Sequence, residues 1–169
     1  MAQKKMQARP AARKPAARKT GSQASKLFKL LKDDHARVLD LFEQVEENGS
    51  DAAQAQELFD RIQKELQVHM TGEEKFFYPA LEQDEEARDQ VLEAYEEHNV
   101  VKTVLKQFGR QSAGGERWMA KVKVLKELVM HHVKEEEREM FKTARGALDV
   151  EQSEDILQRI EQAKQKAGV

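Results

Sequence analysis

Residues 69–79 of the chain read His-Met-Thr-Gly-Glu-Glu-Lys-Phe-Phe-Tyr-Pro. In a helix, residues four apart lie one above the other, so His69 and Glu73 present an imidazole and a carboxylate on the same face. Helical proteins build metal sites from donors of this kind on facing helices. The segment therefore predicts a helix that carries part of a metal site.

The pattern occurs a second time, 63 residues later, as His132 and Glu136. Other pairs related by the same offset are His35 and His98, Asp34 and Glu97, Val38 and Val101, Phe42 and Leu105, and Ile62 and Leu125. Each half of the repeat thus holds a lone histidine and, 34 residues later, a histidine followed by its glutamate. This regularity predicts a duplicated helical hairpin.

Apolar residues at helical spacing define the expected elements. They predict long helices over residues 25–47, 51–78, 85–108 and 116–143 and an amphipathic helix over residues 150–167. Pro79 is expected to end the second helix. Because the loops between the long helices are short, neighbours should be antiparallel. The predicted fold class is all-α, an up-down-up-down four-helix bundle over residues 25–145 with a C-terminal amphipathic helix, residues 146–169, packed on it.

The inward stripes of these helices carry the candidate metal ligands. Two unpaired carboxylates inside a bundle would cost several kcal/mol each, and a bound cation removes that cost. The predicted ligands are His35, His69, Glu73, His98, His132 and Glu136. A plain helical interaction module with a vestigial His/Glu cluster is the alternative.

Three neighbouring polar residues need separate interpretations. His131 lies on a mostly polar face and corresponds to Val68 in the first half, which favours a surface residue or a supporting residue over a ligand. Glu74 and Glu137 also repeat, but about 100° round from the inward stripe. They are interpreted as solvated or interhelical charges.

Composition limits the class of protein. The chain has 169 residues, no cysteine and 36% charged residues. Thiolate sites and disulfides are excluded, and one domain with a sizeable core is expected. We find no apolar run of the roughly 20 residues that a membrane span needs and no signal-peptide core, so a cytoplasmic location is expected.

The N-terminal segment differs from the rest in charge. Residues 1–26 hold eight Lys or Arg and no acid, whereas the other 21 basic residues face 31 acidic ones, a net charge of −10. Residues 1–24 are predicted to form a disordered basic tail. Such a tail could make weak contacts with nucleic acid or another anionic surface, or serve only as a solubilising extension.

Four segments together resemble the hemerythrin-like, or HHE cation-binding, domain over residues 25–145. They are His35, the HMTGEEKFFYP segment, His98 in EEHNVVK and the HVKEEEREMF segment. The resemblance implies a four-helix bundle holding two iron ions, oxo- or hydroxo-bridged. It assigns His35 and His69 to one iron, His98 and His132 to the other, and Glu73 and Glu136 to both as bridges. Imidazole and carboxylate donors also suit manganese or zinc.

The resemblance also implies the kind of ligand. A di-iron protein of this type is expected to bind or react with dioxygen, peroxide or nitric oxide, with catalase-like peroxide decomposition as its enzymatic form. Oxygen-carrying hemerythrins have a further histidine one turn after His98, where this chain has Lys102. The alternative is a non-enzymatic iron or oxygen sensor, or an iron-binding regulatory module.

Overall fold

The computed structural model describes residues 23–110 and 113–169, and every regular element in these ranges is helical. The elements are α1 (Gln23–Glu47), α2 (Ala52–Gly72), the π-helix η1 (Glu73–Phe77), α3 (Tyr78–Leu81), α4 (Arg88–Lys106), the 3₁₀-helix η2 (Phe108–Arg110), α5 (Glu116–Glu135), the π-helix η3 (Glu136–Met140), α6 (Phe141–Ala147) and α7 (Val150–Ala167). The chain is therefore all-α over its described part, as the sequence predicts. Most of the predicted basic tail lies outside the described residues.

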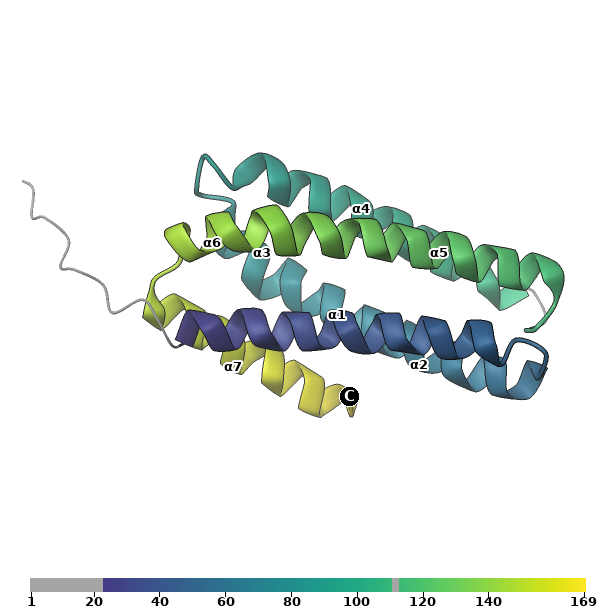
Figure 1. Cartoon of the computed structure of the whole chain (residues 1–169). Coiled ribbons are helices and arrows are strands. Elements are labelled where there is room, and N and C mark those ends of the chain that lie inside the picture. The colour runs from purple at the N-terminus through teal and green to yellow at the C-terminus, as the bar shows by residue number, and fades with distance from the viewer. Residues whose placement is uncertain (1–22, 111–112) are drawn as a thin grey trace, which may run out of the picture.

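The four long helices α1, α2, α4 and α5 run along the same axis (Figure 1). Packing contacts join α1 to α2 and to α5, and α4 to α5. Successive long helices are connected at alternate ends of the molecule, and α7 packs against α1 and α2 (Figure 1). This arrangement agrees with a hemerythrin-like helical fold. Among the helices described, we find none with the length and apolar character needed to cross a membrane.

Two helices begin at aspartate caps that the local sequence supplies. The side chain of Asp51 accepts hydrogen bonds from the backbone N–H groups of Ala53 and Gln54. Asp149 and Gln152 form a reciprocal capping box at the start of α7. Each cap satisfies N–H groups that a helix start leaves without partners.

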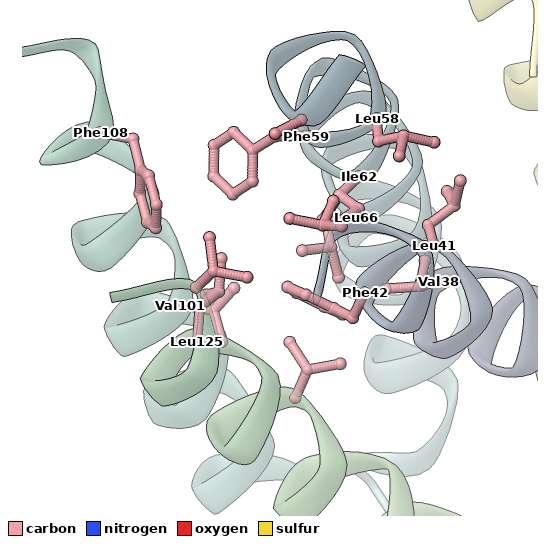
Figure 2. Close-up of a cluster of buried hydrophobic side chains, with 14 of the residues drawn as sticks. Val38, Leu41, Phe42, Leu58, Phe59, Ile62, Leu66, Val101, Phe108 and Leu125 are labelled. Carbon is pink, nitrogen blue, oxygen red and sulfur yellow. The ribbon is translucent and has the colours of Figure 1, made fainter. Parts of the chain in front are cut away.

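The apolar core consists of two clusters that lie on either side of the predicted ligands along the helices. The first cluster includes Val38, Leu41, Phe42, Leu58, Phe59, Ile62, Leu66, Val101, Phe108, Trp118 and Leu125. The second includes Leu27, Phe28, Leu31, Phe77, Tyr78, Val91, Met140, Phe141, Ile156 and Ile160. Figure 2 shows side chains of the first cluster pointing toward one another from different helices. The clusters make the packed frame between which the polar side chains are held.

The prediction that Pro79 ends the second helix is wrong. The helix continues to Leu81 because it first widens into a π-turn, in which the Tyr78 N–H donates to the Glu73 carbonyl. In a π-turn the N–H of each residue donates to the carbonyl five residues earlier, so residue 79 would donate to the Glu74 carbonyl. Because residue 79 is proline, it has no N–H to donate. The hydroxyl of Tyr95 donates to that carbonyl instead, at 3.4 Å.

Gly72 marks a close approach between helices. A Cβ at this position would lie 3.3 Å from Cγ1 of Ile160 on α7. Glycine costs up to about 1 kcal/mol in a helix interior relative to alanine. The close approach of α7 accounts for a glycine immediately before Glu73.

We predict that Phe42→Ala lowers the free energy of unfolding by about 3–5 kcal/mol, because it leaves a cavity in the first cluster. Denaturant titration followed by circular dichroism measures this change. Leu92→Ala, at a side chain that is 46% exposed, is the control and should change stability by less than about 0.5 kcal/mol. Equal losses in the two variants would contradict the proposed role of the cluster.

Candidate metal centre

Both predicted glutamate ligands stand at the first residue of a π-turn. Glu73 begins η1 and Glu136 begins η3. In each turn an N–H five residues on, from Tyr78 or Phe141, donates to the glutamate carbonyl. The duplicated sequence therefore produces a duplicated irregularity at the site, and π-turns of this kind are common at functional sites.

One half of the site contains His35, His69, Glu73 and Glu136, all buried, with one candidate donor atom from each lying within 4.8 Å of the others. The Nε2 atoms of His35 and His69 are 3.0 Å apart. Two nitrogens bound at the roughly 2.0–2.1 Å typical of metal–imidazole bonds, at a right angle, would lie about 3 Å apart. The spacing fits two ligands on one ion.

The other half contains His98 and His132, whose Nε2 atoms are 3.2 Å apart, together with Glu73. The two carboxylate oxygens of Glu73 point to different halves. Oε1 lies 3.2 Å from Nε2 of His69, and Oε2 lies 3.5 Å from Nε2 of His98. Glu73 is thus placed to bridge two cations.

Glu136 faces the first half most closely, with Oε2 at 3.2 Å from Nε2 of His35. Within the described part of the chain, neither this oxygen nor Oε1 of Glu73 has a hydrogen-bond partner. Buried carboxylate oxygens without hydrogen bonds are costly unless a cation binds them. The donor set of four imidazoles and two carboxylates therefore fits the cation that the sequence predicts.

A carboxylate faces the Nδ1 atom of each histidine. The partners are Glu137 for His35 at 3.0 Å, Glu74 for His98 at 2.9 Å, Glu97 for His132 at 2.7 Å and Asp34 for His69 at 3.8 Å. The first three partners lie within hydrogen-bond distance, and such contacts fix the ring orientation and keep Nε2 free as the donor to a metal. Asp34 faces His69 from just beyond that distance, and within the described residues neither of the two facing atoms has a hydrogen-bond partner.

These contacts refine the sequence interpretation of the neighbouring acids. Glu74 and Glu137 lie between helices, as predicted, and each contacts Nδ1 of a predicted ligand histidine. His131 is 62% exposed, and its Nε2 lies 3.3 Å from Glu97, so it touches a supporting carboxylate. The other two carboxylates that face histidines are Asp34 and Glu97, and the 63-residue offset pairs them in the sequence.

Tyr78 is a site residue that sequence periodicity missed. Its hydroxyl is buried and lies 3.3 Å from Nε2 of His98, and 3.4 Å from a carboxylate oxygen of both Glu73 and Glu136. In an uninterrupted α-helix, residue 78 would lie about half a turn away from His69. The π-turn instead stacks Tyr78 on Glu73, and Phe141 holds the related position in the second half.

The pKa values of the buried histidines and glutamates are shifted in different directions. Burial lowers the pKa of His35, but the nearby carboxylates of Glu136 and Glu137 outweigh burial and raise the pKa to about 9. Burial dominates at His69, which has a pKa lowered to about 4. Burial raises the pKa of Glu136, but the contact with His35 outweighs burial and lowers that pKa to about 2. Burial and the charge of Glu136 raise the pKa of Glu73 well above its usual value.

A cavity of about 20 Å³ lies beside the four histidines. Its other lining residues are mainly apolar: Val38, Leu66, Met70, Val101, Val129 and Val133, together with Asp34. A space of this size holds roughly one or two water-sized groups. The site can therefore admit a molecule of a few atoms next to the donor atoms.

The chain matches the family model of the hemerythrin HHE cation binding domain over residues 26–144. It belongs to this family. The match includes the four histidines and both glutamates and stops before α7. A cation-binding function is therefore supported both by the family and by the His/Glu groups of the structure.

The chain is also similar to a curated protein whose name refers to DNA rather than to cation binding. It is a DNA nickase from Nostoc sp. (strain PCC 7120 / SAG 25.82 / UTEX 2576), 31% identical over 137 residues. The similarity covers 81% of this chain but 38% of the nickase, so the chain spans well under half of that protein. No solved structure matches the chain significantly.

We predict that cation affinity rises with pH until it levels off above about pH 9. A cation binds neutral imidazole and ionised carboxylate, so protons must leave His35 and Glu73. Calorimetry in two buffers of different ionisation enthalpy measures the protons released. Proton release at pH 7 is expected, and its absence would contradict the charge distribution.

The same shifts set the pH dependence of stability before a cation binds. The raised pKa of His35 stabilises the fold fully below about pH 6.5, and this contribution is lost as pH rises through 9. The lowered pKa of Glu136 stabilises the fold above about pH 4.5, and this contribution is lost as pH falls through 2.

Proposed function

We propose that this protein is a non-haem di-iron protein that reacts with dioxygen, peroxide or nitric oxide. In this proposal residues 25–145 form a hemerythrin-like up-down-up-down bundle, and residues 146–169 pack on it as a separate helix. The observation that carries the proposal is the position of Glu73, whose two oxygens face two different histidine pairs. One carboxylate between two imidazole pairs is the arrangement that two adjacent cations require.

The proposed ligands divide between two ions. His35 and His69 would hold one, His98 and His132 the other, and Glu73 and Glu136 would bridge them. Imidazole and carboxylate without thiolate suit iron, and also manganese or zinc. A bridged pair with this ligand set leaves open positions where small molecules bind. Two bound iron ions would supply the electrons exchanged with an oxidant.

The cavity supports a small substrate. Its volume of about 20 Å³ matches dioxygen, nitric oxide or hydrogen peroxide and has no room for an alkyl group. The apolar side chains among its lining residues favour molecules of low polarity. Peroxide decomposition would convert two hydrogen peroxide molecules into two waters and one dioxygen.

Tyr78 does not line this cavity and is proposed to hold a proton at the two carboxylates of the centre. Burial and the neighbouring carboxylates raise the pKa of its hydroxyl well above the usual value, so it stays protonated at neutral pH. From its position near His98, Glu73 and Glu136, it can donate to either carboxylate while the centre reacts.

Lys102 supports the site from outside rather than approaching the donor atoms. Its Nζ lies 2.5 and 2.6 Å from the two carboxylate oxygens of Glu74, which in turn contacts Nδ1 of His98. It provides no third imidazole at that half of the centre. We therefore propose rapid oxidation of the reduced protein rather than a long-lived oxygen complex.

We predict that His132→Ala lowers bound iron severely, whereas His131→Ala leaves it nearly unchanged. His132 presents its Nε2 to the donor cluster, and His131 is exposed. Metal analysis of the purified variants, with the optical spectrum of a bridged di-ferric centre, checks the result. Similar iron losses in the two variants would refute the ligand assignment.

We predict that the iron-loaded protein decomposes hydrogen peroxide at least tenfold faster than tert-butyl hydroperoxide, because the small cavity excludes the alkyl group. Tyr78→Phe should lower the rate with hydrogen peroxide by about 10²-fold while keeping the iron, as expected on loss of a positioned proton donor. Oxygen evolution and stopped-flow spectra measure both effects. Equal rates with both peroxides would argue against reaction in the cavity.

A DNA-directed function is the second candidate. It is favoured by the similarity to a DNA nickase and by the eight basic residues, without an acid, in residues 1–26. Phosphate contacts by such a tail would weaken steeply with salt. Gel shifts over a salt series and conversion of supercoiled plasmid to the nicked circle test it. Retention of binding in a chain lacking residues 1–24 would exclude the tail as the contact.

A further inference from the structure

Helix α7 lies beyond residues 26–144, the part that matches the cation-binding family, yet it contacts the centre at two points. The first serves the half that contains His35 and His69, and the second supports the turn that carries Glu73. One is a charged contact through Lys164, and the other is an apolar contact through Ile160.

The charged contact runs through Asp34. Lys164 Nζ donates to Oδ1 of Asp34, which is buried, and Oδ2 of Asp34 faces Nδ1 of His69 at 3.8 Å. Arg37 contacts the same Asp34 oxygen as the lysine, at 3.2 Å. Lys164 thus fixes the side chain of Asp34 with Oδ2 toward His69, which is the place of a carboxylate that orients a metal-binding imidazole.

The apolar contact supports the π-turn. Ile160 lies against Gly72, and its Cγ1 atom is close enough that a single added methyl at residue 72 would be tight. Gly72 directly precedes Glu73, the residue whose oxygens face both halves. The packed isoleucine therefore limits movement of the backbone that aims Glu73.

The second half has different supports at the related positions, and this provides an internal comparison. Glu97 corresponds to Asp34, and its partner besides His132 is the exposed His131 rather than a lysine. Glu135 stands where the first half has Gly72. The two halves of the repeat thus have matching predicted ligands, but the residues that contact the supporting carboxylates differ between them.

We propose that α7 is a positioning element that strengthens cation binding at His35 and His69, and that a cation bound there in turn holds α7 in place. This inference rests on the proposed metal centre. Because coupling between two binding events is reciprocal, the factor by which docked α7 raises cation affinity equals the factor by which the cation favours docking. Occupancy of the first half is thereby communicated to the C-terminal helix.

Lys164 has two opposed effects on cation affinity. The positive charge of Lys164 repels a cation, but it is paired with Asp34, so the net charge seen from the centre is small. Loss of the lysine leaves the half-exposed Arg37 as the cationic contact of Asp34 and removes the contact by which α7 holds this carboxylate toward His69. The orienting effect dominates, and loss of a supporting group of this kind lowers metal affinity by about 10–100-fold.

The test uses the full chain with Lys164→Met. Anaerobic calorimetry with Fe(II), repeated with Zn(II) as a probe without redox chemistry, measures the number of ions and each affinity. We expect one of the two ions to bind about 10–100-fold more weakly in Lys164→Met and the other to be unchanged, with recovery in Lys164→Arg. Unchanged affinities, equal weakening of both ions or a gain in affinity would overturn the proposal.

Lys126→Met is the matched control, because Lys126 pairs with Glu46 across helices at 2.6 Å and has a side-chain exposure of 19% against 12% for Lys164. It should leave both affinities unchanged. Hydrogen exchange provides the reciprocal measurement: α7 amides should be better protected after cation loading in the unmodified chain, and this gain should shrink in Lys164→Met. Absence of a gain in the unmodified chain would refute the coupling.

These outcomes separate the inference from the proposed function. A chain that binds two ions unequally in Lys164→Met but does not react with oxygen or peroxide would keep the coupling and remove the proposed reaction. A chain that reacts but shows no unequal loss would keep the reaction and remove the coupling.

Discussion

The burial of two carboxylates between four imidazoles is the constraint on which the rest of the structure depends. Glu73 and Glu136 are among the most buried residues of the chain, and charge at such depth requires compensation. The histidines supply part of it, and each histidine faces a further carboxylate at Nδ1. Two of these carboxylates, those of Glu137 and Glu74, in turn pair with Lys32 and Lys102 near the surface. The centre is thus a set of alternating charges between two apolar clusters.

The π-turns allow this set to be built from helices. A regular α-helix presents residues three or four apart on one face, which brings His69 and Glu73 together but turns the next residues away. Widening the helix at Glu73 places Tyr78 at the centre as well, and the same widening at Glu136 places Phe141 against His35. The two halves therefore differ at one aromatic position, with a hydroxyl on one side and an apolar ring on the other.

The asymmetry of the supports has a functional meaning if the centre holds two cations. The first half has a lysine from α7 at its supporting carboxylate, and the second half has an exposed histidine at the related carboxylate. Unequal positions suit a centre in which one ion stays bound and the other exchanges or reacts. A helix coupled to one position also gives the alternative sensor function a part of the chain that could report occupancy.

The sequence by itself determined the helical class, the approximate helix ranges, the duplicated pattern and the six side chains that the structure brings together, because all of these follow from periodicity and a constant offset. The sequence did not reveal the π-turns, the continuation of the helix past Pro79 or the place of Tyr78, since each depends on a hydrogen-bond register that neighbouring helices stabilise. The roles of Glu74, Glu137 and Lys164 were likewise decided by tertiary structure. Their partners lie on other helices, up to 130 residues away along the chain, and no local pattern encodes such a distance.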